Sequence, residues 1–164
     1  MNDDEVVQFL AARFPMFEKN EEDWLAGLAR DRMSNQVFMI ATADCTPIGT
    51  IGLHRIDWIS RVATLGISIG EKSHWGGGHG TEAMMLLLQY AFVRSNLRKI
   101  ELDVHMFNER AIRCYQRCGF VLEGRKRAHV FKDGVYHDTL SMGVLLEEWR
   151  PMWEAYKAKQ VVAI

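Results

Sequence analysis

Residues 74–83 read His74-Trp75-Gly76-Gly77-Gly78-His79-Gly80-Thr81-Glu82-Ala83 and lie between a strand-like and a helix-like apolar segment. Four of the five residues from 76 to 80 are glycine, so backbone N–H groups can surround a phosphate without a Cβ atom in the way. The helix expected after this loop adds its unpaired N–H groups and the positive end of its dipole. We therefore interpret the stretch as a site for a ligand that carries a pyrophosphate.

Two common phosphate-binding motifs compete for this stretch. A P-loop requires Lys directly before the Ser or Thr, and here Gly80 precedes Thr81. The G-x-G-x-x-A pattern that begins at Gly78 fits a dinucleotide-binding loop, with the acidic Glu101 or Asp103 about 20 residues further on. That motif follows its strand directly, whereas residues 70–74 intervene here. A glycine-rich turn without any ligand is the third interpretation.

The composition argues for one domain that spans residues 1–164. A chain of 164 residues buries about 70% of its unfolded surface. Its 20 basic and 21 acidic residues give a net charge of −1, which offers no electrostatic case for a nucleic-acid partner. Apolar runs stay short of the ~18 residues of a membrane span, and the acidic residues 3–5 are unlike a secretory signal. We expect a cytoplasmic protein without a membrane partner.

Cysteine and histidine usage argues against a metal site. Three cysteines are an odd number, as expected of reduced thiols in the cytoplasm. Cys114 and Cys118 share a predicted helix face, but the sequence holds no second Cys or His pair at ligand spacing. The six histidines are scattered and form no HExxH motif. No metal is expected.

The hydrophobic pattern predicts a mixed α/β domain. Helices are expected over residues 3–14, 20–33, 81–95 (apolar nearly all round and therefore buried), 109–117 and 147–159 (interrupted at Pro151). Strands are expected over residues 36–42, 48–56, 62–69, 99–105, 120–132 and 135–145. Asn108 is expected to cap the helix that follows it and Gly119 to end it, and Asp133-Gly134 to close a hairpin. This order predicts a mostly antiparallel sheet with one βαβ unit at its centre.

Several blocks of the sequence together resemble the GNAT superfamily of N-acetyltransferases over residues 21–150. The blocks are Leu65–Ile69, Trp75–Ala83, Asn108–Phe120 and a closing hairpin that contains Gly124 and residues 133–138. They are most similar to the branch of ribosomal-protein N-terminal and spermidine acetyltransferases. The resemblance implies the GNAT fold, in which the parallel strands 62–69 and 99–105 splay apart, and it implies acetyl-CoA as cosubstrate.

The resemblance also implies which residues hold acetyl-CoA. The pyrophosphate is expected on the amides of Gly76, Gly77, Gly78, His79, Gly80 and Thr81. The pantetheine arm is expected to pair like an added strand with Ile67, Ser68 and Ile69. Trp75 stands where the family has Gln or Arg, which removes a polar side chain but leaves the backbone role intact. Asn108 is a further expected contact, although a helix cap explains it equally well. Arg113 and Arg117, one helical turn apart, are candidate phosphate contacts, although a solvated basic face is the more common explanation.

Direct transfer of acetyl to a primary amine, in a ternary complex, is the reaction that the resemblance implies. Tyr115 would act as the general acid for the departing thiolate, or be only a packed aromatic, and the N–H of Ile67 would stabilise the oxyanion. Related sequences often carry a Glu base where this chain has Thr64. Candidate replacements are Glu101, Asp103 and His105. A non-catalytic acyl-CoA-binding module is the alternative that Thr64 leaves open.

The sequence also predicts the class of the acetyl acceptor and an association between copies of the chain. The acceptor is expected to be a small-molecule amine or a peptide N-terminus, and the basic run 125–127 favours an acidic peptide or an anionic small molecule over a polyamine, although solvated charge is the more common explanation of such a run. GNAT proteins usually open with a strand before the helices expected here, and Met1 begins after that point. We therefore expect that the chain lacks the first edge strand of the fold or that its start is truncated. A bare sheet edge invites pairing with another chain, so a homodimer or an exchanged strand is expected.

Overall fold

The computed structural model describes residues 6, 8, 9, 27 and 33–161. The helices expected over residues 3–14 and 20–33 therefore lie almost entirely outside the described residues. The described elements are β1 (Gln36–Ala41), β2 (Pro47–Asp57), β3 (Val62–Ile69), a 3₁₀ turn η1 (Lys72–His74), α3 (His79–Gln89), a π-helical turn η2 (Tyr90–Arg94), β4 (Lys99–His105), α4 (Glu109–Arg117), β5 (Val121–Lys132), β6 (Val135–Leu145) and α5 (Leu146–Val161). The predicted strands and their order are confirmed.

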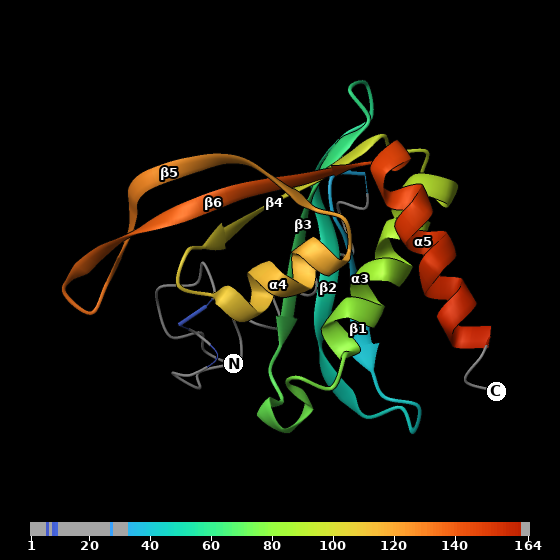
Figure 1. Cartoon of the computed structure of the whole chain (residues 1–164), viewed down its shortest axis with the longest axis horizontal. Helices are drawn as coiled ribbons and strands as arrows, with labels where there is room; N and C mark the ends of the chain where they lie inside the picture. The colour runs from blue at the N-terminus through green and yellow to red at the C-terminus, as the bar shows by residue number, and fades with distance from the viewer. Residues whose placement is uncertain (1–5, 7, 10–26, 28–32, 162–164) are drawn as a thin grey trace.

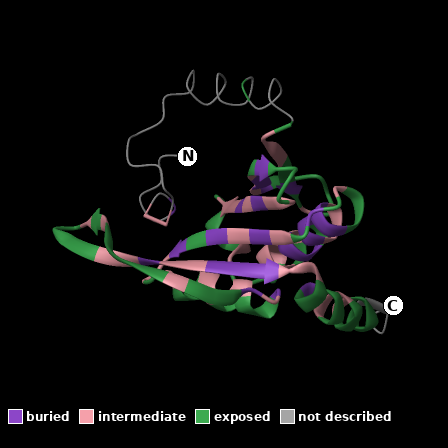
Figure 2. Ribbon diagram, turned by 90° about the horizontal axis from the view of Figure 1, so that it is seen from above, coloured by how far each residue is buried: buried purple, intermediate pink, exposed green. Residues whose placement is uncertain are grey.

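One six-stranded sheet in the order β1-β2-β3-β4-β6-β5 forms the centre of the fold (Figure 1). Neighbouring strands run antiparallel except for β3 and β4. These two run parallel because the connection between them passes through α3. The mixed α/β fold with one central βαβ unit is thereby confirmed. The far part of the β5–β6 hairpin is exposed and reaches beyond the rest of the sheet (Figure 2).

The parallel pair separates after three residue pairs. Val62, Ala63 and Thr64 of β3 pair with β4, and the pairing then ends. On its other side β3 stays paired with β2 as far as Ile69. Residues 65–69 thus present one edge of their backbone to a gap in the sheet, and the expected splay is confirmed.

The core lies between the sheet and the helices α3, α4 and α5, which cover one face of it (Figure 1). Leu53 and Ile100 from the strands and Met84 and Leu88 from α3 are fully buried there. Removing such a side chain from water stabilises the fold by about 1.5–3 kcal/mol. Since strand residues alternate between faces, the opposite face carries the intervening residues, among them Gly66 and Ser68 of β3.

The helix after the glycine loop differs from its prediction in three ways. It begins at His79 rather than Thr81, directly after Gly78, which adopts a φ of +89°. Its last turn, residues 90–94, is π-helical. Leu86 is 51% exposed, so the helix is not buried all round, because only one side of it faces the sheet.

The last helix, α5, runs from Leu146 to Val161 without the interruption expected at Pro151. Pro151 removes one backbone hydrogen-bond donor from the first part of the helix. The start of the helix is stabilised by another bond, in which the Leu145 N–H donates to the Glu148 carboxylate (2.9 Å). Trp149, 2% exposed, anchors the same turn in the core. This packing outweighs the lost bond. No helix within the described ranges has both the length and the apolar character needed to cross a membrane.

Three local predictions near the site are confirmed. The Ala111 N–H donates to Asn108 Oδ1 (3.2 Å), which caps α4. Gly119 follows α4 with a φ of +96°, a conformation that favours glycine. Asp133 and Gly134 both have positive φ and close the β5–β6 hairpin.

Candidate active site

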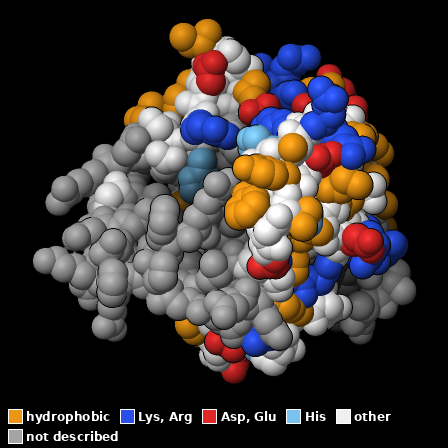
Figure 3. Space-filling model, turned by 90° about the vertical axis from the view of Figure 1, so that its left-hand side faces the viewer, with side chains coloured by type: hydrophobic (Ala, Val, Ile, Leu, Met, Phe, Trp, Pro, Cys, Tyr) orange, Lys and Arg blue, Asp and Glu red, His pale blue; other side chains and the backbone are white. Residues whose placement is uncertain are grey.

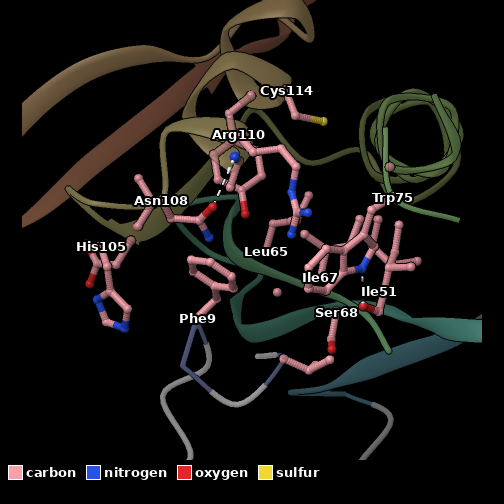
Figure 4. Close-up of a pocket in the computed structure, with 18 of the residues that line it drawn as sticks. Phe9, Ile51, Leu65, Ile67, Ser68, Trp75, His105, Asn108, Arg110 and Cys114 are labelled. Atoms are coloured by element: carbon pink, nitrogen blue, oxygen red, sulfur yellow. Dashed lines mark hydrogen bonds between the residues drawn. The ribbon is translucent and has the colours of Figure 1, made fainter. Parts of the chain in front are cut away.

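A cavity of about 970 Å³ opens at the gap between β3 and β4 (Figure 4). Its walls are the free edge of β3, the glycine loop, one side of α4 and residues 129–132 of β5. Phe9 lines it from the N-terminal part of the chain. The splay of two parallel strands thus brings together segments that are far apart in the sequence.

The edge of β3 meets the loop through an indole. Ile67, Ser68 and Ile69 all line the cavity, and Trp75 Nε1–H donates to the Ile69 carbonyl (2.9 Å). The polar side chain expected to be missing at Trp75 is therefore replaced by an N–H group that turns back onto the strand. This bond engages the Ile69 carbonyl at the end of β3. The Ser68 carbonyl lies against Gly49 of β2, so Ile67 presents the more available backbone groups of the edge.

The glycine loop is built by backbone conformation. Gly76 and Gly78 have φ values of +82° and +89°, where any other residue is strained. A Cβ atom at either position would meet nothing within 4 Å, so open space lies in front of both. The N-cap residue Gly78 has no side-chain oxygen, and first-turn N–H groups of α3 therefore lack a side-chain cap. Such a loop fits a pyrophosphate.

All but one of the loop residues expected to bind the pyrophosphate line the cavity. Trp75, Gly76, Gly78, His79, Gly80 and Thr81 line the cavity, whereas Gly77 is absent from its wall.

An arginine that sequence reasoning missed faces this loop. The guanidinium carbon of Arg110 lies 3.7 Å from the centre of the Trp75 ring, so the cation spans from α4 to the loop (Figure 4). Phe9 meets the same indole edge-to-face, with ring centres 6.4 Å apart. Partial burial lowers the pKa of Arg110, yet a guanidinium remains charged at any physiological pH.

Helical spacing would have identified this arginine. Arg110, Cys114 and Arg117 follow one another at i, i+4 and i+7 and line the cavity together. Arg113 lies outside the cavity wall, is exposed and pairs with Glu109 (3.1 Å). No sequence pattern identifies Phe9 as a site residue, because its contact with Trp75 joins segments that are far apart in the sequence.

Tyr115 lies in the same wall, next to two thiols. Burial, followed by the charge of the neighbouring thiols, raises the pKa of Tyr115 and keeps its phenol protonated. A hydrogen bond from Cys118, against the effect of burial, lowers the pKa of Cys114 to about 6. Thr81 Oγ1 lies 3.4 Å from the Cys114 Sγ and adds to this effect. Within the described residues, no group of three or more His, Cys, Asp or Glu side chains is arranged to hold a metal.

The other side of the gap carries the candidate bases. Asp103 and His105 line the cavity, and Glu101 does not. Burial would raise the pKa of Asp103, but hydrogen bonds from Lys126 and Ser141 outweigh it and lower the pKa overall. Asp103 is therefore stabilised in its ionised form and is only a weak base.

The charge of this face is mixed. Figure 3 shows Lys and Arg side chains interspersed with Asp and Glu over the hairpin end of the molecule. Arg125 pairs with Asp138 and Lys126 with Asp103, so the basic run at residues 125–127 is partly neutralised. In the described part of the cavity wall, Asp103 is the one carboxylate beside three permanent cations. These cations are Arg110, Arg117 and Lys132.

Comparison with known proteins agrees with this geometry. Residues 1–121 match the model of the acetyltransferase (GNAT) domain. The chain belongs to the GNAT family. A GNAT protein with this splayed strand pair and glycine loop uses acetyl-CoA as its cosubstrate, and this one is an N-acetyltransferase. The dinucleotide and P-loop interpretations are wrong, because the chain is a GNAT protein.

Individual GNAT relatives fall in the expected branch. The chain is 34% identical to the spermidine N(1)-acetyltransferase of Vibrio cholerae, over 68% of this chain and 64% of the relative. It is 33% identical to a ribosomal N-acetyltransferase-like protein of Bacillus subtilis, over 62% of this chain and 55% of the relative. Both matches span less than two thirds of the relative. A crystal structure of the Vibrio cholerae spermidine N-acetyltransferase with CoA and spermine superposes with a TM-score of 0.83 at 28% identity, covering 90% of this chain and 86% of that one.

Proposed function

We propose that this GNAT protein transfers acetyl from acetyl-CoA to the primary amine of a peptide N-terminus or a small molecule, by direct attack in a ternary complex. The observation that carries the proposal is the exposed edge of residues 65–69, which ends at the glycine loop inside one cavity. An extended ligand with amide groups can pair with that edge while its phosphates reach the loop. The amine then approaches from the opposite side of the gap.

Acetyl-CoA would be held by groups along one line of the cavity. The amides of Gly76 and of residues 78–81 would face its pyrophosphate, and the cation of Arg110 adds charge there. The Ile67 carbonyl would bond the pantetheine arm. Asn108 uses Oδ1 for its cap, so its amide NH₂ group is a separate donor for the coenzyme.

The acceptor is inferred from the charge of the wall. A polyamine carries several positive charges. Asp103, the carboxylate of the described cavity wall, already forms an ion pair with Lys126 (2.5 Å). The three permanent cations of the wall repel a polyamine. An α-amine with a pKa near 8 carries one charge and loses its proton far more readily than an alkyl amine near 10. We therefore propose a single-amine acceptor for this protein.

The reaction itself needs two groups of the chain besides the binding groups. The N–H of Ile67 is the proposed donor to the oxyanion that forms when the amine attacks the thioester. The phenol of Tyr115 gives its proton to the departing sulfur. Its raised pKa makes a free phenolate costly, so the phenol gives up its proton only as another proton replaces it.

The sheet edge at β1 is the proposed contact between copies of this chain. Among the described strands, β1 lies at the edge of the sheet. Its Phe38 and Met39 are 40% and 69% exposed, and a sheet edge with exposed apolar side chains favours association. One structural relative, the spermidine N-acetyltransferase of Vibrio cholerae, is described as dodecameric. Light scattering of the wild type against Met39→Lys tests this contact.

A thiol-release assay tests the proposed function. CoA release from acetyl-CoA is measured with peptides that have free N-termini, with small monoamines and with spermidine. We expect release with single α-amines and little with spermidine. Tight acetyl-CoA binding without turnover on any amine would instead favour the non-catalytic acyl-CoA-binding module.

A further inference from the structure

The proposed reaction leaves one group unassigned, the base that takes the proton of the amine. Thr64 stands in the position where a carboxylate was expected, and its hydroxyl accepts a hydrogen bond from Arg55 Nη2 (3.1 Å). A hydroxyl with a cation beside it is no base at neutral pH. We propose that His54, on β2, takes this proton through Nε2, an inference that rests on the proposed direct attack of an amine.

His54 lies at the narrow end of the gap. It pairs with Thr64 in the β2–β3 register, next to the point where β3 leaves β4. Its ring lies over Gly66, since a Cβ atom there would come within 3.3 Å of both Cδ2 and Nε2. Both His54 and Gly66 line the cavity. Gly66 directly precedes Ile67, the proposed oxyanion donor, so the imidazole edge lies beside the reacting centre.

A hydrogen bond sets the tautomer of this imidazole. His54 Nδ1 lies 3.2 Å from Asn35 Oδ1. An amide oxygen only accepts hydrogen bonds, so Nδ1 carries the hydrogen and Nε2 keeps its lone pair. Asn35 is thus a positioning residue, and Nε2, which lies over Gly66, keeps the lone pair that accepts a proton.

The surroundings keep His54 neutral. Burial, followed by the charge of Arg55, lowers the pKa of His54 below its usual value. The facing residues of β3, Thr64 and Gly66, are not titratable at neutral pH, and neither is Asn35. The imidazole is therefore an available base at pH 7, close to the working pH that general bases favour.

Three other groups of the cavity wall, Asp103, His105 and His129, fit the role less well. Asp103 is bonded to Lys126 and Ser141, which makes it a weak base. His129 is exposed, and its Nδ1 lies 3.1 Å from Thr139 Oγ1. His105 stacks on Phe107 and lies well away from Ile67 and Ser68 (Figure 4).

The proton balance of the step is complete with these groups. The amine arrives as an ammonium ion and gives one proton to His54 Nε2, which later passes it to solvent. The nitrogen lone pair forms the C–N bond, and the C–S bond breaks as the tetrahedral intermediate collapses. The second proton lost from nitrogen replaces the phenolic proton that Tyr115 gives to the sulfur. The products are the amide, CoA as its thiol and one proton.

The test compares pH profiles of kcat/KM between pH 5 and 8, with a peptide α-amine as acceptor. In the wild type we expect a plateau above the lowered pKa of His54, because the enzyme deprotonates the bound ammonium. In His54→Gln we expect about 10²-fold lower kcat/KM at pH 6.5 and a tenfold rise per pH unit up to the amine pKa near 8. His137→Gln, a histidine outside the cavity wall, should behave as the wild type.

A second variant covers the case in which His54→Gln does not fold. Asn35→Asp places a carboxylate on Nδ1, which raises the pKa of His54 and moves the acid limb to higher pH. An unchanged pH profile in a folded His54→Gln, or an unmoved limb in Asn35→Asp, overturns the role of His54. If the wild type releases no CoA with any amine while it binds acetyl-CoA, the proposed function fails instead.

Discussion

Arg110 and Trp75, which are 35 residues apart in the sequence, face each other across the mouth of the cavity with the guanidinium carbon 3.7 Å from the centre of the indole ring. The contact joins the first turn of α4 to the glycine loop. It also holds the indole so that its N–H donates to the end of β3. Two predictions follow for acetyl-CoA binding.

Arg110→Ala should weaken acetyl-CoA binding by about 5- to 20-fold, because it removes a cation–π contact of ~0.5–1 kcal/mol and a phosphate-binding charge. Calorimetric titration with acetyl-CoA measures the effect. Arg113→Ala is the matched variant, since Arg113 is exposed and paired with Glu109. A larger loss in Arg113→Ala than in Arg110→Ala would contradict this placement of the phosphates.

Gly78→Ala should lower both stability and coenzyme affinity, although a methyl group there meets no atom within 4 Å. The cause is the φ of +89°, which costs a non-glycine residue about 1 kcal/mol or more. Thermal melts and acetyl-CoA titrations measure the two effects. Gly77→Ala is the control, because Gly77 has no positive φ and lies outside the cavity wall. Equal affinity losses in both variants would refute the conformational explanation.

Tyr115→Phe should lower kcat by about 10²-fold and leave acetyl-CoA affinity nearly unchanged. The ring keeps its packing, and only the phenolic proton is lost. Stopped thiol-release assays at saturating acetyl-CoA give kcat, and equilibrium titration gives affinity. If kcat stays at the wild-type value, Tyr115 is a packing residue and not the acid.

Cys114 should react with iodoacetamide at a rate that rises with pH around a midpoint of about 6, the lowered pKa of its thiol. The sign follows because the thiolate is the nucleophile and its fraction grows as the proton leaves. Acetyl-CoA should slow the reaction, since Cys114 lines the cavity. The measurement uses a Cys45→Ser variant, which removes the exposed thiol. Labelling that acetyl-CoA leaves unchanged would place the coenzyme elsewhere.

Local sequence signals predicted those parts of the fold whose cause is local. Asn108 and Gly119 bound α4 because a side-chain cap and a positive φ act within a few residues. Alternating apolar residues placed the strands, since one face of each must be buried. Pro151 misled the prediction because its local cost is small beside the burial of Trp149 in the core.

The sequence by itself determined the strands, the caps, the glycine loop and, through the resemblance of three blocks, the family and its cosubstrate. These depend on backbone preferences and short spacings, which the order of residues carries directly. Only the tertiary structure brought Arg110 onto Trp75, Phe9 to the cavity wall and His54 over Gly66. Such contacts join distant segments, and their geometry follows from where the sheet splays and how the side chains pack around the gap.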